Sequence, residues 1–584
     1  MNAGDWHEQA LDHMQAGRWA EAEQCCRRLL ELEPRHAKAH VNLGLALQTR
    51  GALEEAAQHY RAALEADPGL AQAWFNLGTL SLARLDHRAA AEALQRAVAL
   101  EPARAGWQAA LGSALEADAR PLEAFAALEA AVALDPQDAA AHESLGISLV
   151  NAGEARKAIP SLRRAAELDP TRQSASSNLL FALNYDPAID PETVFEEHRA
   201  WGRRASAGLQ RAAHANSRDP ARRLKIGYLS PDFRANAVSF FIAPLLARHD
   251  RTRFEVHCYS DVEAEDALSA RLRTLADAWH VTAWLSNEAL AERLRADRVD
   301  ILVDLAGHTW GGARMPLFAR KPAPVQATWL GYLNTTGLEA MDYRIADAEA
   351  CPVAMDRFHT ERVVRLPSQW CYAPVASGPA IGPLPARDNG TVTFGSFANL
   401  PKVNDEVIAL WSRVLKAVPG SRLTIVGRGM RQLAPRFAGR FARHGVEAAR
   451  IVAQDFMPLE QYLAFHNRVD LSLDTFPFAG GTTSFHALWM GVPVVTLAGE
   501  HVPSRGGASI LGALGLRELV ARTPEEYVDV ASALARDLPR LAALRRELRA
   551  RLEASSLCDA ASFTGHLEAE YRRMWERWCA AETE

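Results

Sequence analysis

The spacing of apolar residues changes near residue 205 and predicts two kinds of structure in one chain. Before this point apolar residues recur at helical spacing, as at Ala124, Ala127, Leu128 and Ala131. After it, short runs rich in β-branched apolar residues alternate with helical patterns, which is typical of parallel sheets covered by helices. The sequence therefore predicts a multidomain chain, all-α over residues 3–204 and α/β beyond.

The helical region repeats with a period of 34 residues. Three residue types keep this period: Pro34, Pro68, Pro102, Pro136 and Pro170; Gly44, Gly78, Gly112 and Gly146; and Ala22, Ala56, Ala90, Ala124 and Ala158. Small residues let the two helices of a hairpin approach closely, and proline ends the second helix because it has no N–H to donate. The pattern resembles tetratricopeptide repeats, and it predicts five repeats over residues 3–172 and a degenerate sixth ending at residue 204.

Stacked helix pairs of this kind form a superhelix with a concave face. Asn42, Asn76 and Asn178 share one phase of the repeat. Their amides are suited to hydrogen-bond the backbone of an extended peptide, so we predict a peptide groove that holds protein acceptors. The alternative is that these asparagines only satisfy neighbouring turns.

A small and polar stretch, residues 205–222, reads as a linker to two α/β lobes. Strands are predicted in the first lobe (223–385) at Leu224–Ser230, Phe254–Ser260, Val299–Leu305, Pro324–Tyr332 and Asp342–Asp347. Strands are predicted in the second lobe (386–560) at Thr391–Phe397, Leu423–Gly427, Arg450–Phe456, Leu471–Asp474 and Val492–Leu497. A C-terminal helix is expected in residues 561–584. Two Rossmann-like lobes would face each other across a cleft and bind ligands beyond the carboxyl ends of their strands.

Charge and cysteine usage narrow the class of protein. The net charge of −6 does not favour a nucleic-acid binder. The seven cysteines are scattered without CxxC spacing, which argues against a disulfide framework or a zinc site. No signal-peptide pattern and no long apolar run is visible, so we expect no membrane association and a cytoplasmic location.

The loop after the strand at Leu471–Asp474 is the strongest candidate for a binding site. Gly480 and Gly481 let the backbone approach a ligand, and Thr482 and Thr483 add hydroxyl donors at the start of a helix. Free N–H groups and the helix dipole then favour an anion, most simply a diphosphate. The alternative is a capped helix without a ligand.

Polar side chains also follow other predicted strands. Lys402 and Asn399 follow the strand Thr391–Phe397 in the lobe that holds the Gly-Thr loop, so Lys402 is placed to neutralise a diphosphate unless it is an ordinary surface lysine. Asn236 and His308 follow the first and third strands of the first lobe, although a lone histidine is more often structural. The chain has no DxD triplet, so a metal-dependent sugar transferase is not supported and no metal site is predicted.

With these features the chain resembles the tetratricopeptide-containing protein O-glycosyltransferases, the O-GlcNAc transferase and SPINDLY family. The motifs that carry the resemblance are KIGYLSPDF (225–233), RKPAPVQATWLGYLNTTG (320–337), VTFGSFANLPK (392–402), SLDTFPFAGGTT (472–483) and ALWMGVPVVTLAGE (487–500). The resemblance implies a GT-B fold and a metal-independent, inverting transfer of a sugar onto Ser or Thr of a protein. UDP-GlcNAc is the expected donor substrate and no cofactor is expected. GDP-fucose is the alternative donor, because GYLNTTG and FGSFANLPK look closer to SPINDLY.

The resemblance also implies roles for single residues. Diphosphate contacts fall to Lys402 and Asn399, phosphate contacts to Thr482 and Thr483, base contacts to Met457 and Tyr462, and a sugar contact to Thr335.

Three departures from the family pattern leave a second class of function open. Asn236 stands where the family has a histidine proposed to act in catalysis, and an amide cannot serve as a general base. His486 stands where the family has an acidic residue on the ribose, and Leu333 stands where proline is usual. The alternatives are that His308 is the base, or that the chain is a non-catalytic repeat scaffold that senses a nucleotide sugar.

Overall fold

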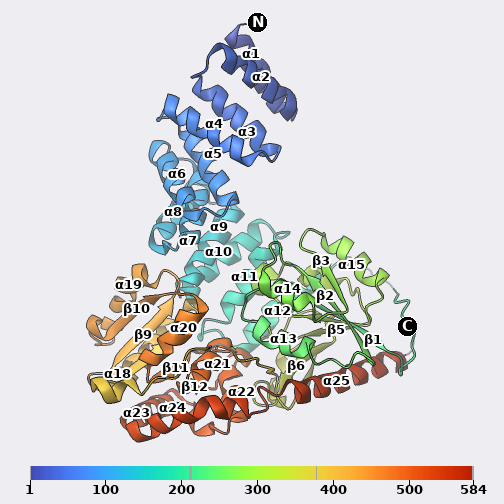
Figure 1. Ribbon diagram of the computed structural model, residues 1–584, viewed down its shortest axis with the longest axis vertical. Coiled ribbons are helices and arrows are strands. Elements are labelled where there is room, and N and C mark those ends of the chain that lie inside the picture. Colours follow the sequence, from blue (N-terminus) through green and yellow to red (C-terminus); the bar gives the residue numbers. More distant parts are fainter. Residues whose placement is uncertain (1, 210–212, 376–377, 582–584) are drawn as a thin grey trace. The chain divides into compact units, whose positions relative to one another are not determined.

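The computed structural model describes residues 2–209, 213–375 and 378–581 (Figure 1). The chain falls into two compact units. The first consists of Met1–Ala152 and Pro160–Asp169, and the second of Gly153–Ile159 and Pro170–Glu584.

Helix pairs in tetratricopeptide order account for the first third of the chain. The helices are α1 (Ala3–Gln15), α2 (Trp19–Leu32), α3 (Ala37–Thr49), α4 (Leu53–Ala66), α5 (Ala71–Ala83), α6 (His87–Leu100), α7 (Ala105–Ala117), α8 (Pro121–Leu134), α9 (Ala139–Asn151) and α10 (Ala155–Leu168). Each second helix ends two residues before one of the periodic prolines, as α2 does before Pro34. The predicted all-α repeat region is confirmed.

The periodic glycines mark the points of closest approach within the helix pairs. A Cβ added to Gly44 would lie 2.5 Å from the Tyr60 ring. At Gly78, Gly112 and Gly146 the added Cβ would lie 2.6, 2.4 and 2.5 Å from Leu94, Leu128 and Leu162. These distances are shorter than any real Cβ contact, so the predicted reason for the small residues holds.

A second periodic contact ties each repeat to the next. The side chains of His40, Trp74, Gln108 and His142 donate an N–H to the carbonyls of Pro34, Pro68, Pro102 and Pro136, over 2.9, 3.0, 3.0 and 3.2 Å. The type of residue differs among the four repeats, but each side chain has an N–H group at this position. That N–H satisfies the carbonyl of the proline in the turn after the helix.

The second unit begins with a further helix pair, α11 (Gln173–Leu183) and α12 (Pro191–Ser206), followed by the first sheet. Its strands are β1 (Leu224–Ser230), β2 (Phe254–Ser260), β3 (Ala278–Val281), β4 (Ile301–Asp304), β5 (Val325–Thr328), β6 (Tyr343–Asp347) and β7 (Arg362–Leu366). They are parallel and ordered β3-β2-β1-β4-β5-β6-β7. The edge strands β3 and β7 were not predicted, because they are partly exposed and lack a continuous apolar run.

Helices connect these strands. They are α13 (Ser239–Leu246), α14 (Ala267–Arg273), α15 (Asn287–Ala296), η1 (Thr309–Gly312), α16 (Met315–Ala319) and η2 (Val353–Phe358).

The second sheet is also parallel, in the order β10-β9-β8-β11-β12-β13. Its strands are β8 (Thr393–Ser396), β9 (Arg422–Gly427), β10 (Ile451–Asp455), β11 (Leu471–Leu473), β12 (Val494–Leu497) and β13 (Val520–Ala521). The helix α17 (Pro385–Asn389) precedes β8. Between and after the strands lie η3 (Leu400–Lys402), α18 (Asp405–Ala417), α19 (Met430–Ala442), η4 (Ala448–Arg450), α20 (Leu459–Phe465), η5 (His466–Arg468), α21 (Thr482–Trp489), η6 (Val502–Arg505), α22 (Gly506–Ala513), η7 (Arg517–Leu519), α23 (Pro524–Arg536) and α24 (Leu538–Glu553). The two parallel lobes confirm the predicted GT-B arrangement, and only the two-residue β13 was missed in this sheet.

The last helix, α25 (Ala560–Ala580), packs on the first lobe, where Figure 1 shows it in red below β1 and β6. Its Glu568 accepts a hydrogen bond from His249 at 2.9 Å, and the buried Trp575 donates to the carbonyl of Asp219 at 3.1 Å. Within the ranges that the structure describes, no helix combines the length and apolar character needed to cross a membrane.

Candidate active site

In both sheets the strand order reverses between two central strands. The reversal falls between β1 and β4 in the first sheet, and between β8 and β11 in the second. Open parallel sheets bind ligands outside the carboxyl ends of strands at such a reversal. The loops that follow β1, β8 and β11 hold Asn236, Lys402 and the Gly-Thr loop, so the fold brings the sequence candidates to the expected edges.

Lys402 and the Gly-Thr loop lie together at the β8/β11 reversal. The half-buried ammonium of Lys402 donates to the carbonyl of Ala479 at 2.8 Å and lies 4.3 Å from the centre of the Phe478 ring. Burial lowers the pKa of Lys402 to about 8, and the nearby Asp474 only partly opposes this. Because burial disfavours the charged form of Lys402, an anion bound beside it would stabilise the ammonium, and a diphosphate would supply that charge.

Asp474 holds the Gly-Thr loop in place through hydrogen bonds. Its buried carboxylate accepts the N–H of Gly480 at 2.7 Å and the hydroxyl of Thr496 at 2.7 Å. A Cβ on Gly480 would lie 2.4 Å from the Ser484 hydroxyl oxygen, so a larger residue there would displace the Ser484 side chain. Sequence analysis noticed this aspartate only as the end of a strand.

The start of α21 has the features of an anion site. Gly481 is its N-cap residue and offers no side chain to cap the helix. Thr482 and Thr483 form the half-buried first turn. Since the first N–H groups of a helix have no partner within the helix, this terminus favours a bound anion.

A cluster of aromatic side chains, here called the aromatic cluster, is formed around His486 of α21. The rings of Tyr462 and His486 lie 5.7 Å apart, and Phe240 from the first lobe lies 5.0 Å from His486. The Tyr462 hydroxyl, the Tyr372 hydroxyl and His486 Nε2 are buried and lack a hydrogen-bond partner among the described residues. Because buried polar atoms are normally paired, these three point to a ligand.

Two further features of the aromatic cluster are the charge of His486 and the position of Met457. Burial lowers the pKa of His486 to about 4, so the imidazole is neutral at physiological pH. Met457 is half-buried and precedes α20, which carries Tyr462. Sequence analysis missed Phe240 and Tyr372, because nothing local in the sequence links them to the second lobe.

Asn236 and Asn399 lie on loops at the two strand reversals. Asn236 is half-buried, and its side-chain oxygen accepts the N–H of Val238 at 3.3 Å. It lies four residues before Phe240, the first-lobe member of the aromatic cluster. Asn399 is exposed, and its main-chain carbonyl accepts the N–H of Lys402 at 3.0 Å.

His308 is buried, and both of its ring nitrogens make hydrogen bonds. Its fully buried ring donates from Nε2 to the carbonyl of Thr336 at 2.9 Å, and Nδ1 accepts the Ser177 hydroxyl at 3.0 Å. Burial lowers the pKa of His308 to about 3. Both nitrogens are engaged, so a role as the base would require one of these bonds to be broken, and the alternative that His308 is the base stays a prediction.

Thr335 is also held inside the first lobe. Its buried hydroxyl donates to the carboxylate of Glu361 at 2.7 Å and accepts the N–H of Gly337 at 3.1 Å. The predicted sugar contact through this hydroxyl would require these bonds to be shared or broken.

The three asparagines of the predicted peptide groove divide between the two units. Asn42 and Asn76 belong to the first and Asn178 to the second. Asn76 is buried, its oxygen accepts from Gln72 at 2.8 Å, and its amide nitrogen has no partner within the described residues. The groove remains a prediction.

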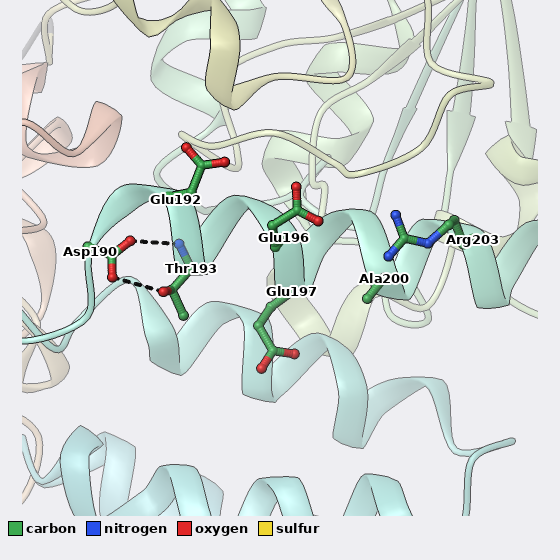
Figure 2. Close-up of a pocket in the computed structure, with 7 residues that line it drawn as sticks. All are labelled: Asp190, Glu192, Thr193, Glu196, Glu197, Ala200 and Arg203. Atoms are coloured by element: carbon green, nitrogen blue, oxygen red, sulfur yellow. Dashed lines mark hydrogen bonds between the residues drawn. The ribbon is translucent and has the colours of Figure 1, made fainter.

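A hollow of about 420 Å³ lies along one side of α12 (Figure 2). It is lined by Asp190, Glu192, Thr193, Glu196, Glu197, Ala200 and Arg203. Asp190 caps the helix by accepting the N–H and the hydroxyl of Thr193, at 2.8 and 2.9 Å. The acidic lining is unsuited to a diphosphate, and none of the predicted site residues contributes to it.

The structure combines tetratricopeptide repeats with two parallel-sheet α/β lobes of the GT-B kind. The profile of glycosyl transferase family 41 matches residues 208–373 and 384–567, and tetratricopeptide profiles match residues 7–71, 75–139 and 110–172. The chain belongs to glycosyl transferase family 41.

Individual relatives agree with this assignment. The chain is 41% identical over 419 residues to a Petunia hybrida protein described as probable UDP-N-acetylglucosamine–peptide N-acetylglucosaminyltransferase SPINDLY, covering 70% of this chain and 44% of the relative. It is 32% identical over 375 residues to the Arabidopsis thaliana protein described as probable UDP-N-acetylglucosamine–peptide N-acetylglucosaminyltransferase SEC, covering 62% of this chain and 38% of that one. It spans about half the length of these curated relatives or less.

A solved structure is similar over most of the chain. A mutant of the Thermobaculum terrenum O-GlcNAc transferase is 40% identical with a TM-score of 0.81, over 87% of this chain and 98% of the other.

Proposed function

We propose that the protein transfers a sugar from a nucleotide diphosphate onto Ser or Thr of protein acceptors held by the repeats. The donor in this proposal is UDP-GlcNAc. The observation that carries it is the ammonium of Lys402, 2.8 Å from the Ala479 carbonyl at the β8/β11 reversal and next to the uncapped start of α21.

The proposed mechanism depends on where negative charge develops during sugar transfer. When the bond between the sugar and the diphosphate breaks, negative charge grows on the leaving phosphate. Lys402 and the first N–H groups of α21 are fixed donors aimed at this place, and such preorganised donors stabilise the transition state without a metal ion. The acceptor hydroxyl attacks the opposite face of the sugar, which inverts the anomeric configuration. Its proton passes to water or to a donor phosphate oxygen, because the amide of Asn236 cannot accept it.

In this proposal the nucleoside binds at the aromatic cluster around His486. Tyr462 and His486 supply buried polar atoms without protein partners, and Met457 supplies backbone groups at the entrance. The names of the relatives support UDP-GlcNAc as the donor. The SPINDLY-like motifs keep GDP-fucose as the second candidate.

Purified protein tested against a panel of nucleotide sugars, with and without protein acceptors, separates the candidates. We expect binding and transfer with UDP-GlcNAc, and loss of both in Lys402→Ala. Transfer only from GDP-fucose would select the O-fucosyltransferase alternative. Binding of a nucleotide sugar without transfer or hydrolysis would select the non-catalytic scaffold, and no binding at all would overturn the proposal.

A further inference from the structure

One residue in the turn of each repeat hairpin has a left-handed backbone. These residues keep the period of 34: Gly17 (φ 70°), Gly51 (φ 83°), Leu85 (φ 61°), Ala119 (φ 58°) and Gly153 (φ 76°). Leu85 and Ala119 show that the turn itself accommodates a side chain. Its conformation alone therefore does not explain the glycine at 153.

The surroundings of Gly153 differ from those of the other two glycines. A Cβ on Gly153 would lie 2.8 Å from the carbonyl oxygen of Leu400 and 3.0 Å from that of Val403. A Cβ on Gly17 or Gly51 would meet nothing within 4 Å. Because main-chain oxygens cannot rotate away as a side chain can, the turn at Gly153 lies directly against the segment that carries Lys402.

Ion pairs fix the residues that follow Gly153 to the same lobe. Glu154 pairs with Arg436 of α19 at 2.8 Å. Arg156 pairs with Asp186 at 2.5 Å and with Glu406 at 2.8 Å, so one guanidinium bridges the α11–α12 connection and the start of α18. Glu406 lies four residues beyond Lys402 and Gly153 contacts both flanks of the lysine, so the turn constrains this segment along its length.

The same segment is held from its other side by Asn404. Its Nδ2 donates to the carbonyl of Tyr185 at 3.1 Å and to that of Phe476 at 2.8 Å, and its Oδ1 caps α18 at Val407. The Lys402 segment thus contacts parts of the chain from three places, and the turn at Gly153 is the one that keeps the 34-residue period of the left-handed turns.

We propose that the turn Gly153–Arg156 is a positioning element that sets the ammonium of Lys402 at the diphosphate site. The turn follows the repeat pattern in sequence but clusters with the second unit in space. The inference rests on the proposed function in one respect, that Lys402 contacts a nucleotide diphosphate.

The test is a double-mutant cycle on the affinity of the full chain for UDP and GDP. Gly153→Ala adds a methyl group against two carbonyls, whereas Gly51→Ala strains an equivalent turn in open space. We expect Gly153→Ala to weaken binding about tenfold or more, the size of one lost charge-assisted hydrogen bond, and Gly51→Ala to leave it unchanged. In a Lys402→Ala background Gly153→Ala should have no further effect, because coupled residues are not additive.

The outcomes separate this inference from the proposed function. Equal losses from Gly153→Ala with and without Lys402, or no loss while Lys402→Ala weakens binding, overturn the positioning role alone. A wild-type chain that binds neither UDP nor GDP overturns both. If Gly153→Ala does not fold, Arg156→Ala replaces it in the cycle. Its control is Arg28→Ala, which removes a comparably exposed arginine that pairs with Glu31 of its own helix at 2.8 Å, and Arg156→Lys should partly restore affinity.

Discussion

The phenolic oxygen of Tyr332 and Nε2 of His198 lie 2.6 Å apart, in a buried network that joins α12 to the loop after β5. His198 Nδ1 donates to the carbonyl of Val194, so Nε2 accepts and the tyrosine hydroxyl donates. The same hydroxyl accepts the amide N–H of Asn184 at 2.8 Å. The degenerate sixth helix pair is therefore attached to the first lobe by satisfied polar groups.

Replacing Tyr332 by Phe should destabilise the second unit by about 1–3 kcal/mol, because His198 and Asn184 would each keep a buried polar atom without its partner. Chemical unfolding followed by fluorescence measures the change. Tyr343→Phe is the control, since the Tyr343 hydroxyl has no hydrogen-bond partner within the residues described. Equal costs for the two variants would contradict the role of the network.

Much of this architecture was visible in the sequence. The 34-residue period placed every helix pair, because close helix contacts demand Gly or Ala at fixed intervals, as the 2.4 Å approach at Gly112 shows. The central strands were equally clear, since burial on both faces leaves an unbroken apolar run. The edge strands β3 and β7 were not, because one side of each is partly exposed.

The candidate site was predictable only in part. Lys402 and the Gly-Thr loop stood out because each follows a buried strand of the same lobe. The pairing of His486 with Phe240 joins residues almost 250 positions apart, and no local pattern signals it. His308 is a different case: its place after a strand suggested chemistry, but its two nitrogens are engaged by Ser177 of α11 and by the carbonyl of Thr336.

The charge on Lys402 should make nucleotide binding depend on pH. Its pKa is lowered to about 8, chiefly by burial, so the unliganded protein loses this positive charge as the pH rises through 8. We expect the affinity for UDP or GDP to be constant below that value and to fall up to tenfold per pH unit above it. Lys402→Arg should bind more weakly but without this decline, because arginine stays charged. A wild-type affinity that is flat from pH 7 to 10 would contradict the assignment.

His486 should act on the nucleoside and not on the diphosphate. His486→Ala should weaken binding of UDP or GDP several-fold and leave the affinity for inorganic pyrophosphate unchanged. Because the pKa of His486 is lowered to about 4 by burial, the wild-type contact should not vary between pH 6 and 8. His486→Asp, which introduces the residue type usual in the family, should retain nucleotide binding. Calorimetry measures the binding of UDP, GDP and pyrophosphate to the wild-type protein and both variants, and an equal loss for pyrophosphate in His486→Ala would refute this role.

The asparagines of the repeats should matter only for long acceptors. Replacing Asn42, Asn76 and Asn178 together by Ala should raise KM for protein acceptors and change little for peptides that reach only the cleft. The reason is that amides at one repeat phase can bind an extended backbone without reading its side chains. Turnover of a long and a short acceptor by the same variant gives the comparison. If both lose activity equally, the groove is not in the repeats.

The last prediction separates Asn236 from His308. Asn236 should orient an oxygen of the acceptor or donor, since its amide has both donors and an acceptor. Asn236→Ala should then cost a modest factor in kcat, well below the ~10²–10⁴-fold typical of a lost general base. Asn236→His should raise kcat and add an acidic limb to the pH–rate profile near the unperturbed histidine pKa of ~6.5. A loss of 10³-fold or more in Asn236→Ala would show that the loop after β1 does more than orient.

His308→Gln tests the other half of the argument through stability. The folded pKa of His308 is lowered to about 3 by burial, against ~6.5 in an unfolded chain, so the unfolded state takes up the proton first as pH falls. The wild-type protein should therefore lose stability between pH 6.5 and 3. The variant should be less stable at pH 7, because the Ser177 and Thr336 bonds are disturbed, yet its unfolding free energy should depend less on pH. A folded variant with normal turnover and an unchanged pH–rate profile would fit a packing role for His308. Loss of most turnover without loss of stability would support His308 as the base.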